Sequence, residues 1–373
     1  MSAEQSLRSP AECVVRVDDR EISDLYPYLA EVRVESSREA ATVCTLLIDS
    51  LRSESGDWLV QDAGILTPWK RILIEARFGE RSEEIMRGYI RELRMDYPQE
   101  MGGAQVTVEG QDESLLLDRE HLRRVWSTQE QQLSDGQIAR QIGSDFGLDA
   151  QVEAGLTNTT LSCDTTAIRF LRERAAANGF ELAVRRGTLY FGPPQLEGEA
   201  QPAIMVYAGQ ASNCINLVVR HDGHRPDQVW LTRQADDGTE TEDEIFEPDL
   251  SLLGSDAIDS GSAGLGPFVW AMRQPPGATG EEQRTRAQAK ANANAWKIVA
   301  EGELDGTLYG HVLMTHATVL VDGIGPTYDG RYYVDAVTHR FTADGYRQSF
   351  RLLRNATGEQ SAAAQTQPLK QVV

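Results

Sequence analysis

The pattern that most constrains this chain is the alternation of side chains over residues 330–355, on both sides of a short turn. Before the turn Ala343-Asp344-Gly345, one face would carry Tyr332, Val334, Ala336 and Thr338, and the other Tyr333, Asp335, Val337, His339 and Phe341. After the turn, one face of the second strand would carry Tyr346, Gln348, Phe350 and Leu352, and the other would carry Arg347, Ser349, Arg351 and Leu353. Period-two alternation around a glycine-containing turn predicts a β-hairpin. Tyr, Phe and Val suit such a pleated surface.

A weaker form of the same pattern lies in residues 88–108. Gly88 and Tyr89 begin a strand that turns at 98–103 and returns over 104–108. Two explanations stay open at this point: two copies of one β-module, or similar strand composition arising by chance. A true repeat would place two related β-modules in one chain.

Composition and charge exclude several classes of protein. With 373 residues, 40% hydrophobic and 25% charged, the chain has room for two or three globular domains. A net charge of -21 opposes general nucleic-acid binding, since it repels phosphate. No apolar run approaches the roughly 18 residues of a membrane helix, and residues 1–10 show no secretory signal. We expect synthesis in the cytoplasm, no stable membrane insertion, and export, if any, by another route.

The first region, residues 1–115, is predicted to be a β-barrel or sandwich. Its strands are expected at 13–17, 29–34, 42–48, 72–78, 84–95 and 104–109. Short strands separated by polar, Gly or Pro connectors are typical of such folds. Cys13 and Cys44 fall in these apolar runs. Together with Cys163 and Cys214 they form no CxxC or metal-ligand spacing, so we expect free thiols and a reducing compartment.

Residues 116–202 are predicted to form an inserted α+β domain. Ser134 and Gln137 have the spacing of a capping box, and Leu133 and Ile138 that of a hydrophobic staple, ahead of a helix that Gly147 would end. A second helix is expected over 165–178, with Asp164 as its N-cap and Gly179 after its end. A tight hairpin, with strands at 180–184 and 188–191, would follow.

Residues 203–357 are predicted to form a second β-barrel with one helix. Strands are expected at 203–207, 215–220, 228–232, 301–308, 312–315 and 317–321, before the closing hairpin, and an alanine-rich helix at 281–300. The stretch 235–262 contains ten Asp or Glu residues. We expect a solvated, mobile loop there that can be shortened without loss of the fold, with an acidic contact to a basic partner as the alternative. The polar tail 358–373 is expected to be flexible.

The residues give no positive indication of catalysis. His221 and His224 flank Asp222-Gly223, a pair that favours a turn more than a metal site. His339 lies on an alternating strand, and His311 and His316 bracket a short one. GxSxG, Walker and HExxH motifs are missing from the sequence, and Gly323-Ile324-Gly325 continues into Pro326 rather than a helix. We therefore predict no catalytic, cofactor-binding or metal-binding residues, and a protein that is not an enzyme.

Three places in the sequence resemble the phage late control D family, the baseplate hub proteins of contractile tails, which are related to the N-terminal part of type VI secretion spike proteins. They are the closing hairpin with Gly323, the run from Thr166 through Asn178-Gly179-Phe180 to Phe191, and Asp135 to Leu148. The signature residues, with two from the weaker repeat, are Gly88, Tyr89, Phe170, Leu171, Gly179, Phe180, Gly330, Tyr332, Val334, His339, Phe341, Gly345, Tyr346 and Phe350.

This resemblance implies a mainly β (α+β) fold, in which two tube-type antiparallel β-barrels embrace the inserted α+β domain. It further implies a homotrimer whose six barrels form a pseudo-sixfold ring, and which joins a hexameric tail tube to a trimeric spike among other baseplate subunits. Because the chain ends about 18 residues after the last expected strand, the spike is expected to be a separate polypeptide. A β-barrel cell-wall hydrolase and a monomeric binding module remain the alternatives. Phage, bacteriocin and injection particle are not distinguished.

Overall fold

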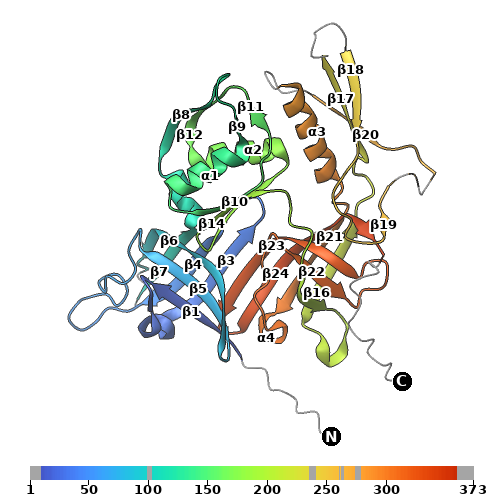
Figure 1. Cartoon of the computed structure of the whole chain (residues 1–373). Coiled ribbons are helices and arrows are strands. Elements are labelled where there is room, and N and C mark those ends of the chain that lie inside the picture. The colour runs from blue at the N-terminus through green and yellow to red at the C-terminus, as the bar shows by residue number, and fades with distance from the viewer. Residues whose placement is uncertain are drawn as a thin grey trace. The chain divides into compact units, whose positions relative to one another are not determined.

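The computed structural model describes residues 10–98, 103–234, 241–259, 261, 264–273 and 279–358. It is mainly β, as predicted (Figure 1). The chain divides into two compact units. Unit 1 comprises Met1–Pro194, Glu303–Thr315 and Asp335–Phe350, and unit 2 comprises Gln195–Gly302, His316–Val334 and Arg351–Val373. The predicted partition into two barrels and an insert stays a prediction.

Unit 1 is built on an antiparallel sheet with the strand order β24-β23-β3-β4-β7-β6-β5-β1-β2. Its N-terminal strands are β1 (Ala11–Val17), β2 (Arg20–Glu21), β3 (Leu29–Ser37), β4 (Val43–Ser50), β5 (Arg71–Phe78), β6 (Arg81–Asp96) and β7 (Ala104–Asp112). A short 3-10 helix, Ser23–Tyr28, precedes β3. All six strands predicted in this region are confirmed. Alternating residues such as Val32, Val34, Leu46 and Ile48 are buried on one face of the sheet.

The predicted C-terminal hairpin is also confirmed, as β23 (Gly330–Thr342) and β24 (Gly345–Arg354). Within unit 1, β23 pairs antiparallel with β3, so that Phe341 lies opposite Val32 and Ala336 opposite Ser37. Phe341 and Tyr346 stack with ring centroids 4.0 Å apart, and both belong to the core that β1, β3, β4 and β5 line. The last strands of the chain thus complete the core begun by the first.

The α+β part of unit 1 follows β7. Its elements are the 3-10 helix Glu113–Asp118, β8 (His121–Ser127), β9 (Leu133–Ser134), α1 (Asp135–Asp145), β10 (Asp149–Val152), β11 (Thr157–Asn158), β12 (Leu161–Thr166), α2 (Ala167–Asn178), β13 (Glu181–Arg185) and β14 (Thr188–Gly192). The capping box is confirmed: Ser134 Oγ accepts from the Gln137 amide, and the Gln137 side chain accepts from the Ser134 amide.

The predicted start of α2 is wrong. Its N-cap is Thr166, not Asp164, because Asp164 pairs with Arg123 in the β12–β8 ladder and is held in extended backbone. The end of the helix is as predicted, with Gly179 in the left-handed conformation at φ 68°. The hairpin after it is confirmed as β13 and β14, with Arg186 and Gly187 at positive φ in the turn.

Unit 2 contains a second sheet segment and a smaller layered element. Strands follow the order β16-β21-β24-β23-β22, with β15 pairing parallel to β22. The bounds are β15 (Gln201–Met205), the 3-10 turn Gly209–Ala211, β16 (Cys214–His221), β21 (Ile298–Asp305), β22 (Thr318–Asp322) and β25 (Ala356–Thr357). A three-stranded sheet, β17 (Gln228–Gln234), β18 (Thr241–Phe246) and β20 (Val269–Met272), packs against α3 (Gly280–Asn294) through Val229, Leu231, Ala287 and Ala291.

Four predictions for the C-terminal half need correction. The acidic stretch 235–262 is not one loop, because residues 241–246 form β18, paired with β17, and Asp256–Ala257 forms β19, while 235–240, 260 and 262 lie outside the described residues. The helix predicted to 300 ends at Asn294, since Ile298–Asp305 is strand β21. The strand predicted at 301–308 ends at Asp305, because residues 306–309 form a short helix, α4. Residues 312–315 form no strand.

Two further expectations concern the ends of the chain and membranes. Residues 1–9 and the predicted flexible tail, apart from Gly358, lie outside the described residues. Among the residues that the structure describes, no helix has the length and apolar character needed to cross a membrane.

Because β3 pairs with β23, removing the C-terminal part of the chain tests whether the core of unit 1 needs both ends of the sequence. A fragment of residues 1–194 lacks Val312, Phe341 and Tyr346, which belong to the core of its own unit. We expect this fragment to expose apolar surface and to lose cooperative unfolding in urea, whereas the full chain unfolds cooperatively. A fragment that unfolds with the sharpness of the full chain would contradict the shared core.

Candidate functional site

The signature residues of the hairpin lie in the protein interior rather than around a cleft. Tyr332, Val334, His339, Phe341, Tyr346 and Phe350 are all buried. His339 Nδ1 lies 2.8 Å from the Tyr346 hydroxyl. Burial lowers the pKa of His339 to about 3 and raises that of Tyr346 well above its usual value. Both side chains are therefore neutral, and their hydrogen bond fixes the register of β23 against β24 instead of moving a proton.

A buried arginine that the sequence did not single out organises the other end of the hairpin, in unit 2. Arg354 is fully buried and donates to the carbonyl oxygens of Tyr328 at 2.8 Å and of Gly358. Its guanidinium lies 5.2 Å from the ring of Tyr332. Gly330, at φ 126°, would place a Cβ 3.0 Å from Arg354 Nη2, so the signature glycine makes room for this cation. The only sequence signal was an arginine continuing the apolar face of Phe350 and Leu352.

The signature residues of α2 also build a core. Phe170 stacks on Trp126, and Phe180 meets Phe191 edge to face at 5.4 Å. Leu171 is fully buried. Gly179 supplies the left-handed residue that turns the chain from α2 into β13.

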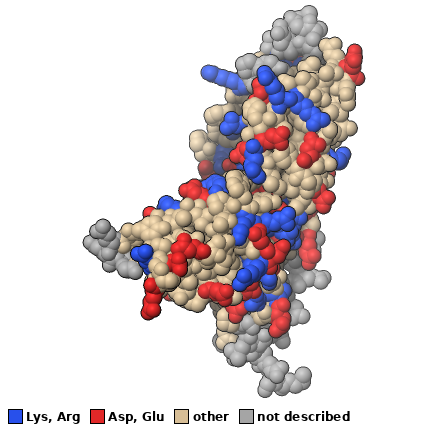
Figure 2. Space-filling model, turned by 90° about the vertical axis from the view of Figure 1, so that its left-hand side faces the viewer, with Lys and Arg blue, Asp and Glu red and all other residues tan. Residues whose placement is uncertain are grey.

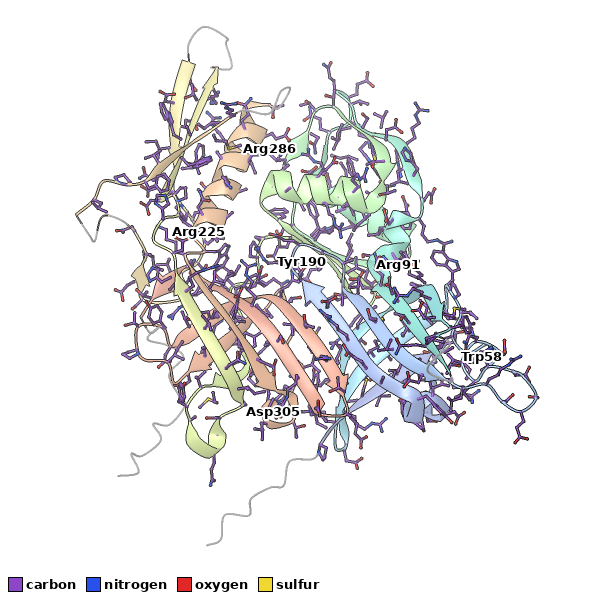
Figure 3. All side chains as sticks on the ribbon, turned by 180° about the vertical axis from the view of Figure 1, so that it is seen from behind. Trp58, Arg91, Tyr190, Arg225, Arg286 and Asp305 are labelled. Atoms are coloured by element: carbon purple, nitrogen blue, oxygen red, sulfur yellow. The ribbon has the colours of Figure 1, made fainter. Side chains whose placement is uncertain are left out.

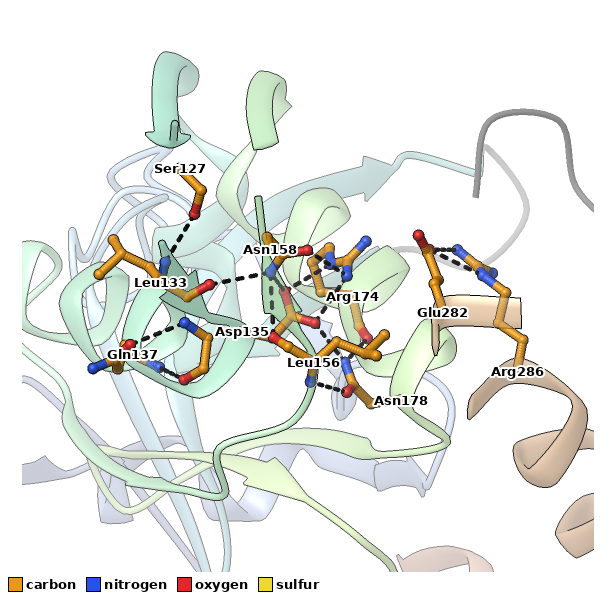
Figure 4. A network of polar contacts seen from close by, with 11 residues as sticks. Ser127, Leu133, Asp135, Gln137, Leu156, Asn158, Arg174, Asn178, Glu282 and Arg286 are labelled. Atoms are coloured by element: carbon orange, nitrogen blue, oxygen red, sulfur yellow. Dashed lines mark hydrogen bonds and ion pairs between the residues drawn. The ribbon is translucent and has the colours of Figure 1, made fainter. Parts of the chain in front are cut away.

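A buried polar network joins the two helices of this region (Figure 4). Asp135 is fully buried and accepts from Arg174 Nε at 2.8 Å, from Asn158 Nδ2 at 2.8 Å and from Asn178 Nδ2 at 2.6 Å. Asn178 Oδ1 in turn accepts from the Leu156 amide at 2.7 Å. Such a network costs desolvation energy but admits only one arrangement of α1, α2 and the loop between β10 and β11.

A cavity of about 340 Å³ occurs in unit 2. Another, of about 310 Å³, occurs in unit 1 and is lined by Asp112, Glu84, Arg87 and Arg185 among others.

Acidic groups of unit 1 outside the Asp135 network are also held by hydrogen bonds within the fold. Burial raises the pKa of Asp112, which accepts from the amides of Thr42 and Ser114. Asp305, labelled in Figure 3, caps α4 by accepting from the Thr307 and Leu308 amides at 3.0 Å.

The histidines outside the hairpin do not converge. His224 donates its amide to Asp222 at 3.0 Å, as expected for the predicted turn, and stacks on Phe268. His221 lies near Tyr328, and His311 contacts Glu83 at 2.9 Å. Over the described ranges, no three His, Cys, Asp or Glu side chains are grouped to hold a metal. All four cysteines are free, and burial raises the pKa of Cys13 and Cys44 to about 12.

Charged and aromatic side chains lie on the surface of the described residues. On the face shown in Figure 2, acidic and basic side chains are interspersed among uncharged residues. Trp58, on the loop between β4 and β5 (Figure 3), meets Tyr97 edge to face at 5.2 Å.

Gly88 tests the packing role of the signature glycines. A Cβ at this buried position would lie 1.9 Å from the Gln111 carbonyl oxygen on the paired strand. We expect Gly88→Ala to lower the free energy of unfolding by about 2 to 4 kcal/mol in urea titrations. Gly223→Ala, where a Cβ meets nothing within 4 Å, is the matched control, and equal stability of the two variants would refute the steric account.

Burial of the neutral His339 side chain is expected to make the stability of the fold depend on pH. Since its pKa falls from 6.5 to about 3 on folding, the unfolded chain binds a proton in this window that the folded chain does not. Stability is therefore lost as the pH falls below about 6.5, by roughly 1 to 2 kcal/mol between pH 6.5 and 5. His339→Gln should reduce this loss by that amount, and His224→Gln, at an exposed position, controls for the substitution. An unchanged pH profile in His339→Gln would contradict burial of a neutral imidazole.

The fold is shared with solved tail proteins. The 43 kDa tail protein of prophage MuSo2 from Shewanella oneidensis superposes with a TM-score of 0.66 at 15% identity, covering 93% of this chain and 99% of that one. The tail protein from Neisseria meningitidis MC58 superposes with a TM-score of 0.64 at 13% sequence identity, and the match covers 93% of this chain and 97% of that one. The E. coli c3393 protein superposes with a TM-score of 0.53 at 10% sequence identity, and the match covers 91% of this chain and 76% of that one. That protein is described as a component of the type VI secretion system with structural similarity to the T4 tail proteins gp27 and gp5.

These likenesses confirm, at the level of the fold, the resemblance to tail hub proteins predicted from the sequence. No curated protein matches the sequence. One family model does match, over residues 9–213, which is more than half of the chain. The chain belongs to the family described as the Alg8 N-terminal domain.

Proposed function

We propose that this protein is the structural baseplate hub of a contractile tail or tail-like injection particle. The observation that carries the proposal is the end-to-end match: 93% of this chain superposes on 99% and 97% of two tail proteins. A match of whole chain to whole chain supports a common architectural role better than one shared module does, although fold alone does not set function.

The proposed assembly is a homotrimer. Each chain would supply two tube-type β-barrels, one from residues 1–115 and one from 203–357, around the α+β insert of 116–202. Three chains would then form a pseudo-sixfold ring, able to dock a hexameric tail tube on one side and a trimeric spike on the other. Closed rings bury repeating interfaces without leaving open edges. Other baseplate subunits would bind the outside, and the protein would reach its place by assembly in the cytoplasm into the particle.

The proposed role is architectural rather than catalytic, without nucleic-acid binding or membrane insertion. Its support is that the buried titratable groups described above have structural partners. Asp135 is held by Arg174, Asp112 by backbone amides and His339 by Tyr346. A general acid or base needs a reacting group within reach, whereas these groups are engaged with the fold.

The oligomeric state tests the proposal. We expect the purified protein, alone or mixed with a spike protein from the same source, to have about three times the chain mass of 41.3 kDa in native mass spectrometry. We also expect it to retain a tail tube protein from the same source in pull-down assays. A protein that stays monomeric with both candidate partners, or that releases sugars from purified cell walls, would overturn the hub and favour a binding module or a hydrolase.

A further inference from the structure

Strand β16 (Cys214–His221) has an apolar sequence but no buried face. Five of its first six residues are apolar, yet none of its eight residues is buried. Ile215 is 49% exposed and Val218 66% exposed, and their odd spacing places them on opposite faces of the strand. Strands normally bury at least one face, so β16 has the surface of a strand that something else covers.

The strand also stands at an edge. In the sheet order of the described residues, β16 is terminal and pairs only with β21. Edge strands of monomeric proteins are usually protected by charges, prolines or bulges, because free backbone groups recruit further strands. Apart from Arg220 and His221 at its end, β16 has no such protection.

The loop before β16 presents an aromatic side chain in a fixed position. Tyr207 is 94% exposed and has φ 50°, a conformation that non-glycine residues seldom adopt. The loop is held by Ser212 Oγ, which accepts from the Ala208 amide at 2.7 Å, and by Asn213 Oδ1, which accepts from the Met205 amide at 2.8 Å. A tyrosine presented on a preorganised loop is typical of an interface anchor.

Charge is missing from this whole stretch. Residues 200–219 contain no Asp, Glu, Lys or Arg, in a chain where one residue in four is charged. Depletion of charge together with an exposed aromatic is the compositional signal of an interface centre. We define the β16 surface as Tyr207 together with residues 214–219.

We propose that the β16 surface binds a second copy of this chain. Each copy carries a net charge of -21, so two copies repel one another, and they repel least when they meet through uncharged surface. A basic partner would instead be attracted to the acidic residues elsewhere on the protein. The inference rests on the proposed homotrimer and assigns it an interface. In a threefold ring the contact is heterologous, so the β16 surface meets a different surface of its neighbour.

The like charge of the two copies and the apolar character of the β16 surface fix the sign of the salt dependence of self-association. Added salt screens the repulsion between like-charged copies and strengthens burial of apolar surface when the anion is sulfate. Self-association through the β16 surface is therefore expected to tighten between 50 mM and 500 mM salt. A contact built on attraction to a basic partner weakens over the same range.

The test compares dissociation constants of full-length variants by sedimentation equilibrium at both salt concentrations. Val218→Lys, Val218→Glu and Tyr207→Asn, the last compatible with the positive φ, should each weaken self-association at least about tenfold. Ile245→Lys is the matched control: it is a β-branched residue of unit 2, 61% exposed on β18, and it should associate like the wild type. Circular dichroism confirms that each variant is folded.

The outcomes separate the two proposals. If the wild type forms trimers and all three variants do too, the hub stands and the β16 interface is wrong. If the variants still form trimers but lose the tube protein, the tube is the occupant and the proposal is overturned. Self-association that weakens between 50 mM and 500 mM salt would show that attraction between unlike charges holds the copies together, and would also overturn it. A wild type that never self-associates, even with the spike, overturns the trimer and this inference together.

Discussion

The structure depends on the pairing of β23 with β3. This ladder joins residues about 300 positions apart in sequence, since Phe341 faces Val32, and it brings Phe341 and Tyr346 into the core lined by Val15, Val32 and Ile74. Closing so long a loop costs conformational entropy that only the completed core offsets. Unit 1 therefore forms as a whole, from both ends of the chain, and the hairpin that dominates the sequence is the element that completes it.

Buried polar groups then fix how these elements fit. The His339–Tyr346 hydrogen bond sets the hairpin register in unit 1, Asp135 and Arg174 lock α1 to α2, and Arg354 joins the end of β24 to Tyr328 in unit 2. Each group is hydrogen-bonded, so its burial costs desolvation energy but favours one arrangement over alternatives. The buried signature residues, among them Tyr332, His339 and Tyr346, thus help to specify the framework of the fold.

Local rules predicted much of this framework. Features set by residues close together in sequence occur in the structure as expected. They are the Ser134–Gln137 capping box, Gly179 after α2 and the alternation from Tyr332 to Leu352. The errors arose where tertiary pairing overrides local preference. Asp164 is drawn into a ladder with Arg123, the acidic residues 242–244 pair with β17, and Ile298 starts a strand although it continues the apolar stripe of α3. Arg354 and the Asp135 network could not be predicted, because their partners are distant in sequence.

The interior of this chain is fixed by its own contacts, and the proposed hub role would depend on what binds its surface. The central claim of that proposal is a threefold ring of chains, and the rotational symmetry of the purified oligomer in cryo-electron microscopy tests it most directly. The account predicts class averages with threefold symmetry and two β-lobes per chain around a central opening. A closed particle with twofold symmetry, or one whose class averages show a single chain, would contradict it.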